Sequence, residues 1–197
     1  MNYIIFDNFR RNYLLPLTFT RPVADIRIGI LTIREKWEYF LGEKTSSLTE
    51  DYLSAKYPIV KADDNILING SVIPNEKLVK EIKGLDNNQV LVKGDVIIAL
   101  RVSASDLDHI DDTEGMDEIE TSSEYLKLNT SWEVFEKNDE ALRADFAIIT
   151  RGRKSQALSK TNTLIGDDIF IEEGARVEGA TINTTKGPVY IGRDVEI

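Results

Sequence analysis

The sequence predicts an open α/β sheet over residues 1–150, a linker over residues 151–163 and the first coils of a β-helix over residues 164–197. The first observation behind this prediction is that short apolar runs alternate with segments whose apolar residues recur at helical spacing, a pattern typical of α/β sheets. The second is an aliphatic residue that recurs every six positions near the C-terminus, a period typical of a β-helix.

The first strand, loop and helices are predicted from the N-terminal third of the chain. Residues 3–6 are a short apolar run, typical of a buried strand, and a loop rich in Arg and Pro follows over residues 7–22. Apolar residues at helical spacing predict a helix over residues 29–41, which Gly42 can end. Thr49 is expected to cap a short helix that follows it.

The second buried strand is predicted at residues 66–68, closed by Asn69-Gly70, and Pro74-Asn75 is expected to open the next helix. Two further apolar runs, residues 90–92 and 96–100, flank a Gly-Asp turn, and this pattern predicts a hairpin. In open α/β sheets, ligands bind at the carboxyl ends of the strands. The loop after the first strand is therefore the first place to look for a site.

The rest of the α/β region is less apolar. Residues 106–124 carry many acidic side chains, which favours a solvated surface segment. Ser131 is expected to cap a helix in which Trp132 and Phe135 face inward. His109, the single histidine, lies in the acidic stretch, and we expect it to be a solvated surface residue.

The aliphatic repeat defines the predicted β-helix. Ile165, Ile171 and Val177 stand six residues apart, and so do Ile191 and Ile197. In a β-helix one aliphatic side chain per strand points toward the axis. Two ordinary hairpins with coincidental spacing are the alternative. Because a solenoid needs about three or more stacked units, we expect the native protein to continue the pattern past the end of this sequence.

The composition of the chain argues against several classes of function. The chain has 197 residues and a formal net charge of −10, which argues against general binding of nucleic acids or anionic membranes. It contains no cysteine, so disulfides, thiolate metal sites and Cys nucleophiles are excluded. The start of the sequence lacks the features of a signal peptide, and no apolar run reaches the roughly 20 residues needed to span a bilayer. We therefore expect a soluble cytoplasmic protein.

The loop over residues 7–22 is unusually basic for so acidic a chain. It contains Arg10, Arg11 and Arg21, and the planar guanidinium group suits the oxygens of a phosphate. A phosphate-binding loop and a set of surface ion pairs with the acidic excess are both compatible with this composition.

The loop also resembles a known family. Leu14-x-Pro16-Leu17-Thr18-x-x-x-Pro22 is similar to part of the sugar-1-phosphate nucleotidyltransferase signature. The whole chain resembles a GlmU-like group of sugar nucleotidyltransferases, of the UDP-N-acetylglucosamine pyrophosphorylase type. The runs that carry this resemblance are residues 11–23, 29–37 and 187–192. It implies a Rossmann-like nucleotidyltransferase sheet followed by a left-handed parallel β-helix.

The resemblance implies a reaction and a set of site residues. A nucleoside triphosphate and a sugar 1-phosphate would give a nucleotide sugar and pyrophosphate. Arg11 and Arg21 are the expected catalytic residues, in contact with the triphosphate and the leaving pyrophosphate. The expected nucleotide- and phosphate-binding residues are Asp7, Asn8, Arg10, Thr18, Asn69 and Gly70.

The sequence departs from the family pattern at two places. The glycines that let the backbone approach the phosphates are replaced by Phe9 to Tyr13. The family also holds Mg²⁺ with an aspartate after a strand, and Ser71 stands at the corresponding position after Asn69-Gly70. Asp7 and Asp95 are the remaining candidate metal ligands.

Two alternatives to an active nucleotidyltransferase follow from these departures. The domain could bind a nucleotide or nucleotide sugar without turnover, or serve as the structural domain of a hexapeptide-repeat acyltransferase. Hexapeptide β-helices of this group associate as trimers, so the resemblance implies a homotrimer for the intact protein.

Overall fold

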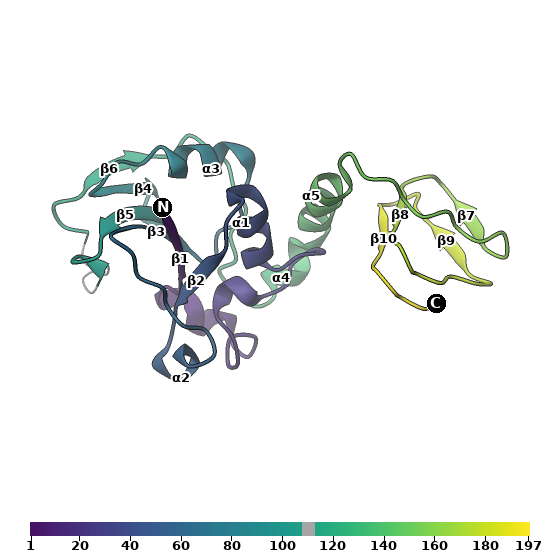
Figure 1. Ribbon diagram of the computed structural model, residues 1–197, viewed down its shortest axis with the longest axis horizontal. Coiled ribbons are helices and arrows are strands. Elements are labelled where there is room, and N and C mark those ends of the chain that lie inside the picture. Colours follow the sequence, from purple (N-terminus) through teal and green to yellow (C-terminus); the bar gives the residue numbers. More distant parts are fainter. Residues whose placement is uncertain (108–112) are drawn as a thin grey trace. The chain divides into compact units, whose positions relative to one another are not determined.

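Three parallel strands from separate stretches of the chain form one half of a six-stranded sheet in the computed structural model, which describes residues 1–107 and 113–197 (Figure 1). Strand β1 (Asn2–Phe6) lies between β2 (Thr45–Leu48) and β3 (Asp64–Asn69), and pairs with both in parallel. The runs at residues 3–6 and 66–68 are thus confirmed as buried strands, whereas the polar edge strand β2 was not predicted.

The other half of the sheet is built around the predicted hairpin. Strands β4 (Gln89–Lys93) and β5 (Val96–Ser103) are antiparallel, β5 pairs with β3, and β6 (Asp117–Glu120) pairs in parallel with β4. The strand order is β2-β1-β3-β5-β4-β6. Since only β5 runs against the others, the carboxyl ends of the remaining strands share one edge of the sheet.

The apolar positions of these strands meet in the core of the sheet. Ile4 of β1, Leu67 of β3, Val90 of β4 and Leu100 of β5 belong to one cluster of buried side chains. Burial of apolar side chains is the main favourable contribution to the free energy of folding. Strand β6 adds no buried residue of its own, as expected for the acidic stretch, whereas Leu107, Thr121 and Ser123 of the same stretch are buried.

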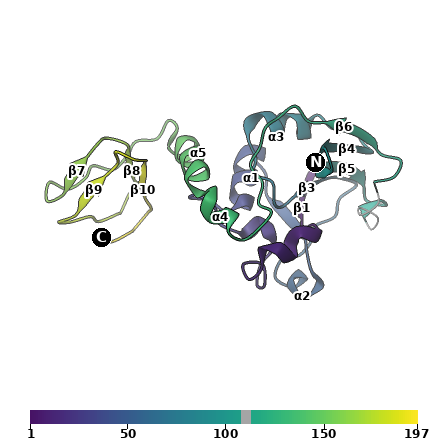
Figure 2. The same cartoon turned by 180° about the vertical axis from the view of Figure 1, so that it is seen from behind.

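Two helices in this part of the chain start and end where their capping residues stand. Helix α1 (Ile33–Leu41) begins after a capping box made by Thr32, and Gly42 ends it in the left-handed region with φ of 75°. Helix α3 (Glu76–Lys83) begins after Asn75, whose side chain accepts the Leu78 N–H. The two lie next to each other in both views (Figures 1 and 2).

Two helix predictions are wrong in detail, one because of a local turn and the other because of a long-range hydrogen bond. Helix α1 starts at Ile33 and not at Gly29, since the preceding residues form a turn closed by the Arg27–Thr32 bridge. The short helix α2 (Asp51–Ser54) follows Glu50 without a side-chain cap. Thr49 instead donates its hydroxyl to Asp7, across 42 residues of sequence.

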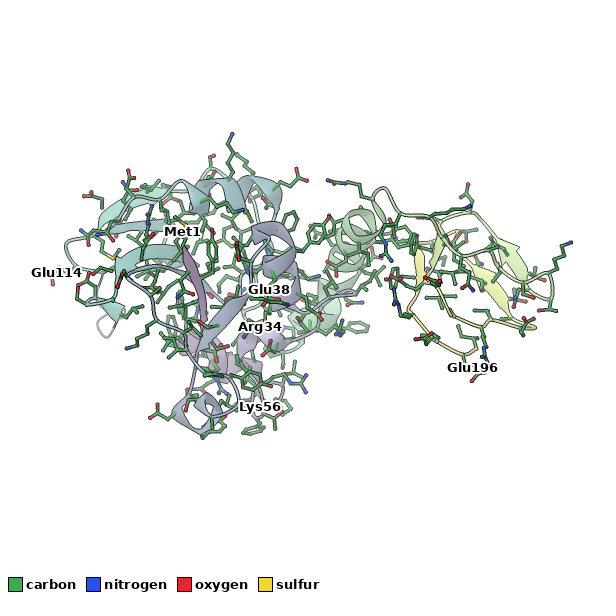
Figure 3. The ribbon with its side chains drawn as sticks, viewed as in Figure 1. Met1, Arg34, Glu38, Lys56, Glu114 and Glu196 are labelled. Carbon is green, nitrogen blue, oxygen red and sulfur yellow. The ribbon has the colours of Figure 1, made fainter. Side chains whose placement is uncertain are left out.

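Polar side chains of α1 fasten the edge strand β2 to the sheet. Arg34 donates to Asp25, at 2.6 Å, and to side chains at the start and middle of β2. Glu38, one turn further, accepts the Thr45 N–H at 3.0 Å. Both residues are labelled in Figure 3, where they lie on the same helix. These contacts hold the polar strand against α1, in addition to its parallel ladder with β1.

Residue contacts divide the chain into two units, Met1–Lys137 and Asn138–Ile197. The first ends with the short helix α4 (Glu133–Glu136), and the second begins with α5 (Asn138–Thr150). Ser131 caps neither helix, and Trp132 and Phe135 are 64% and 88% exposed, so their predicted inward orientation is wrong. None of the helices formed by the described residues has the length and apolar character that crossing a bilayer requires.

Beyond α5, the second unit consists of short strands that pair in parallel. Strand β7 (Thr163–Ile165) pairs with β9 (Thr181–Asn183), and β8 (Ile169–Ile171) pairs with β10 (Val189–Ile191). A third parallel bridge joins Arg176 and Glu196. The residues paired in these ladders stand 18 to 20 positions apart in the sequence, a near-constant spacing of the kind that stacked repeats produce.

The buried side chains of these coils follow the six-residue period only in part. Ile171, Val177 and Ile191 form a buried cluster with Ala175, whereas Ile165 is 43% exposed. The inward position next to β7 is filled by Ile182 of its partner strand. The left-handed β-helix and the domain bounds at 150 and 163 stay predictions.

Candidate functional site

The loop over residues 7–22 lies at a topological switch point of the sheet. From β1 the chain passes to β2 on one side and then crosses to β3 on the other. The carboxyl ends of these three neighbouring parallel strands therefore meet at Asp7, Thr49 and Gly70. Ligands of open α/β sheets bind at such a point. The 3₁₀ helices η1 (Phe9–Leu14) and η2 (Val23–Asp25) shape the loop itself.

Asp7 fastens three separate segments together at this point. Its Oδ1 accepts the Val23 N–H at 2.8 Å, and its Oδ2 accepts the Thr49 hydroxyl at 2.6 Å and the Arg11 Nε–H at 3.1 Å. Burial raises the pKa of Asp7 above its usual value, while the three donors oppose that change. Both carboxylate oxygens are occupied, so Asp7 holds the loop in shape.

Arg11 is a buried clamp and not an exposed phosphate contact in this structure. Its side chain is 5% exposed and pairs with Asp7. The guanidinium also donates to the Thr18 carbonyl and to the Tyr52 hydroxyl, the latter at 2.9 Å, and lies 5.8 Å from the centre of the Tyr52 ring. Thr18, fully buried, returns a bond from its hydroxyl to the Arg11 carbonyl. These bonds fold the loop back on itself.

The end of β3 reaches the same place through amide side chains. Asn8 donates to Asn69 at 3.2 Å, and the same Asn69 oxygen accepts the Ser71 N–H and hydroxyl. Gly70 donates its N–H to the Phe6 carbonyl at 2.9 Å. A Cβ at Gly70 would stand 3.1 Å from that carbonyl oxygen, so the close approach of β1 and β3 favours glycine here.

Two of the three predicted arginines remain exposed to solvent. Arg10 lies on η1, with its guanidinium 5.3 Å from the centre of the Phe9 ring. Arg21 lies further along the loop and, among the described residues, forms no ion pair or side-chain hydrogen bond. It lines a pocket of about 360 Å³, whose other lining residues are Pro16, Leu17, Thr20, Ile26, Arg27 and Val134.

A basic cluster, made of Lys127, Lys137 and Arg10, borders this loop and was not predicted from the sequence. The segment around Lys127 pairs with the chain after β3: Leu128 donates its N–H to the Ser71 carbonyl at 2.9 Å, and Val72 bridges Lys127. Ser131 in turn donates to the Tyr13 carbonyl at 3.2 Å. Lys127 is only 8% exposed, and its ammonium donates to Asn129.

The electrostatics of Lys127 differ from those of Arg11. Burial lowers the pKa of Lys127 to about 8, and the positive charge of Arg10 acts in the same direction. Glu133 opposes the shift, but its carboxylate is engaged by the Asn129 N–H and by Lys137 at 3.2 Å. One sequence signal could have pointed to Lys127: it stands between Leu126 and Leu128, in the alternation of apolar and polar residues that is typical of an extended segment.

The two candidate magnesium ligands, Asp7 and Asp95, have different surroundings. Mg²⁺ is typically bound by one or two carboxylates together with substrate phosphates. Both carboxylate oxygens of Asp7 accept hydrogen bonds from protein donors. Asp95 is exposed on the β4–β5 turn, at the same edge of the sheet but on the far side of β3 from Asp7. Within residues 1–107 and 113–197, no group of three acidic, His or Cys side chains could hold a metal ion.

The structure brings most of the predicted site residues to one place. Hydrogen bonds join Asp7, Asn8, Arg11, Thr18 and Asn69 at the strand ends, and Gly70, next to Asn69, donates its N–H to the Phe6 carbonyl. Arg10 and Arg21 lie on the same loop but outside that network, and Asp95 lies on a separate turn. His109 lies outside the described residues.

The chain was compared with known proteins. A family model described as sugar nucleotidyl transferase matches residues 3–154. No curated protein matches the chain.

Proposed function

The chain belongs to the sugar nucleotidyl transferase family, and from this premise we propose that it joins a nucleoside triphosphate to a sugar 1-phosphate. An oxygen of the sugar phosphate attacks the α-phosphorus, and the bond between the α- and β-phosphates breaks. The products are a nucleotide sugar and pyrophosphate. The observation that carries the proposal is the basic loop at the carboxyl ends of β1, β2 and β3, inside the matched region.

The exposed arginines are suited to bind the triphosphate. Charge on the leaving pyrophosphate increases during the reaction, and fixed positive groups stabilise such charge. Arg21 is solvent-exposed and borders a pocket, and Arg10 lies on the same loop. Since their charges are unmatched within the described residues, both are available to a phosphate.

The buried part of the loop has a different task in this proposal. Arg11, Asp7 and Thr18 bond to one another and to β2, so they fix the loop on which Arg10 and Arg21 stand. Substrate-binding groups act best when their position is fixed before the ligand arrives. We therefore assign positioning to Arg11, in place of the direct phosphate contact that the family resemblance implies.

Several finer expectations are part of the proposal. They are substrates of the UDP-N-acetylglucosamine type, a requirement for Mg²⁺, a left-handed hexapeptide β-helix and a homotrimer of the intact protein. The parallel ladders of the second unit support the β-helix. Because Asp7 is occupied by donors, no step is assigned to a metal held by the protein.

A binding domain without turnover is the second candidate function. The observation that favours it is that the predicted metal acid Asp7 is engaged, in a loop that lacks the family glycines. Such a domain would bind a nucleotide or nucleotide sugar as a regulatory or structural part of a hexapeptide-repeat acyltransferase.

The proposal is tested by measuring pyrophosphate release with each common nucleoside triphosphate and sugar 1-phosphate, with and without Mg²⁺. We expect release with one pairing, and a loss of about 100-fold or more in Arg21→Ala, the scale seen when a charge-stabilising group is removed. Lys80→Ala, which removes an exposed cation on α3, serves as the matched control.

Thermal shifts of the same proteins separate the two candidates. A ligand that binds only the folded state at about 100 times its Kd adds roughly 2.7 kcal/mol. A nucleotide that stabilises the protein without pyrophosphate release supports the binding domain. Unchanged turnover in Arg21→Ala would show that the charge of Arg21 has no part in the reaction.

A further inference from the structure

The charges around Lys127 do not balance. Arg10, Lys127 and Lys137 contribute three positive charges, and Glu133 contributes the one negative charge that acts on Lys127 from nearby. Glu133 is already bonded by Lys137 and by the Asn129 N–H. Among the described residues, no carboxylate lies within 4 Å of the Lys127 ammonium. A net positive cluster therefore stands in a chain of net charge −10.

A buried ammonium without an ionic partner is costly. Desolvation disfavours the charged form, and proteins usually pair such a group with an acid. Lys127 is 8% exposed as a residue, and its ammonium has a neutral amide oxygen of Asn129 as its partner. The packing of the segment does not depend on the ammonium, because the backbone of Lys127 and Leu128 makes the contacts with Val72 and Ser71.

The cluster lies where substrate is expected. Its segment runs beside Ser71 at the end of β3, and Ser131 contacts Tyr13 of the loop. Arg10 of the loop is near enough to Lys127 for its charge to lower the pKa of that lysine. Two cations from segments more than a hundred residues apart in the sequence thus border the same strand ends.

We propose that Lys127, together with Arg10, binds a phosphate group of the substrate at this edge of the sheet. Lys137 holds the site by donating to the Lys127 carbonyl at 2.6 Å and by engaging Glu133. The identity of the ligand rests on the proposed function, whereas the site itself rests on the unbalanced charges. The phosphate comes from either the nucleotide or the sugar 1-phosphate.

Binding of a phosphate at this site depends on pH. The groups that act on Lys127 are Arg10, Glu133 and Lys137. A bound dianion favours the protonated ammonium, so binding takes up a proton when Lys127 is partly neutral. Because the pKa of Lys127 is about 8 in the free protein, affinity falls as pH rises above this value.

The experiment is calorimetric titration with two probes, pyrophosphate and glucose 1-phosphate, between about pH 6.5 and 9.5. The variants are Lys127→Met, Lys127→Arg and, as the matched control, Lys80→Met. We expect Lys127→Met to weaken at least one probe about 10- to 100-fold, which corresponds to the loss of a hydrogen bond to a charged group. Lys127→Arg keeps binding but loses the fall in affinity that deprotonation of Lys127 causes above about pH 8, since arginine stays protonated. Lys80→Met leaves affinity and pH dependence unchanged.

Each outcome of the titrations either identifies the phosphate that Lys127 binds or rejects the proposed site. If Lys127→Met weakens the binding of pyrophosphate alone, Lys127 binds the nucleotide. If it weakens the binding of glucose 1-phosphate alone, Lys127 binds the sugar phosphate. Equal affinity of wild type and a folded Lys127→Met for both probes overturns the proposal, as does a wild type that binds neither. Probe binding that depends on Lys127, in a protein that releases no pyrophosphate from any substrate pair, keeps this inference and rejects the proposed function.

Discussion

Two buried basic residues of the first unit have opposite surroundings. Arg11 has a carboxylate, a carbonyl and a hydroxyl as partners, and its network reaches Asp7, Thr18 and Thr49. Lys127 has one amide oxygen and neighbouring positive charge. Both side chains are less than a tenth exposed.

This difference separates a structural charge from one that is available to a ligand. A buried charge that is fully paired makes its neighbours depend on it, because removal leaves an unpaired partner behind. A buried charge that is poorly paired lowers the stability of the free protein and recovers that cost when an anion binds. The comparison predicts that removing the two cations has effects of opposite sign on stability.

The largest effect is expected for Arg11→Met. It leaves the Asp7 carboxylate buried without its ionic partner, a change that typically costs about 3–5 kcal/mol of unfolding free energy. Burial already raises the pKa of Asp7, and loss of the Arg11 charge raises it further. The loss of stability is therefore full at neutral pH and shrinks as pH falls and Asp7 takes up a proton.

Urea unfolding near pH 7 and near pH 5 measures this prediction. The double variant Asp7→Asn/Arg11→Met is the control, because it removes both charges and should recover part of the loss. A single Arg11→Met variant as stable as the wild type at both pH values would mean that the Arg11 clamp does not hold the loop.

The second effect has the opposite sign. We expect Lys127→Met to raise the unfolding free energy near pH 7 by about 1–2 kcal/mol, since it removes a poorly paired buried charge. Lys127 has its pKa lowered from 10.5 to about 8 by folding. The cost of its charge is thus full below pH 8 and is relieved as pH rises toward 10.5.

Thermal melts of wild type and Lys127→Met at pH 7 and at about pH 9.5 test this sign. The gap between them should narrow at the higher pH. A variant that is less stable than wild type at both values would make Lys127 a structural residue like Arg11, and the comparison would lose its basis.

The smallest effect is expected for Thr49→Val. The substitution keeps the shape of the side chain and removes one of the three donors to Asp7. A hydrogen bond typically contributes about 0.5–1.5 kcal/mol to stability, and the two remaining donors to Asp7 keep the loss in the lower part of that range. Thr20→Val, at an exposed position of the loop over residues 7–22 and outside the Asp7 network, is the control for urea unfolding.

The sequence predicted the apolar elements well. β1, β3 and the β4–β5 hairpin are short apolar runs, and α3 begins directly after the expected Asn75. Strand β2 was missed because Thr45 to Leu48 is mostly polar and is held by Arg34 and Glu38 of α1. Contacts of this kind are set by tertiary structure and leave no periodic pattern in the sequence.

The candidate site was predicted in its location but not in the task of each residue. Arg10, Arg11 and Arg21 are equivalent in composition, yet only Arg11 turns inward toward Asp7. Lys127 reaches the site through pairing with the chain after β3, a contact between distant segments. Local sequence cannot distinguish a paired arginine from an exposed one, because the difference lies in which distant groups approach it.

The bonds that meet at Asp7 also link the motions of distant segments. One carboxylate joins the loop after β1, the first residue of η2 and the residue that follows β2. Opening of the edge strand must break the bond at Thr49, and loosening of the loop weakens the same junction. We therefore expect the two to exchange their amide hydrogens as one cooperative unit. A ligand that tightens the loop would slow hydrogen exchange in β2, which it never touches.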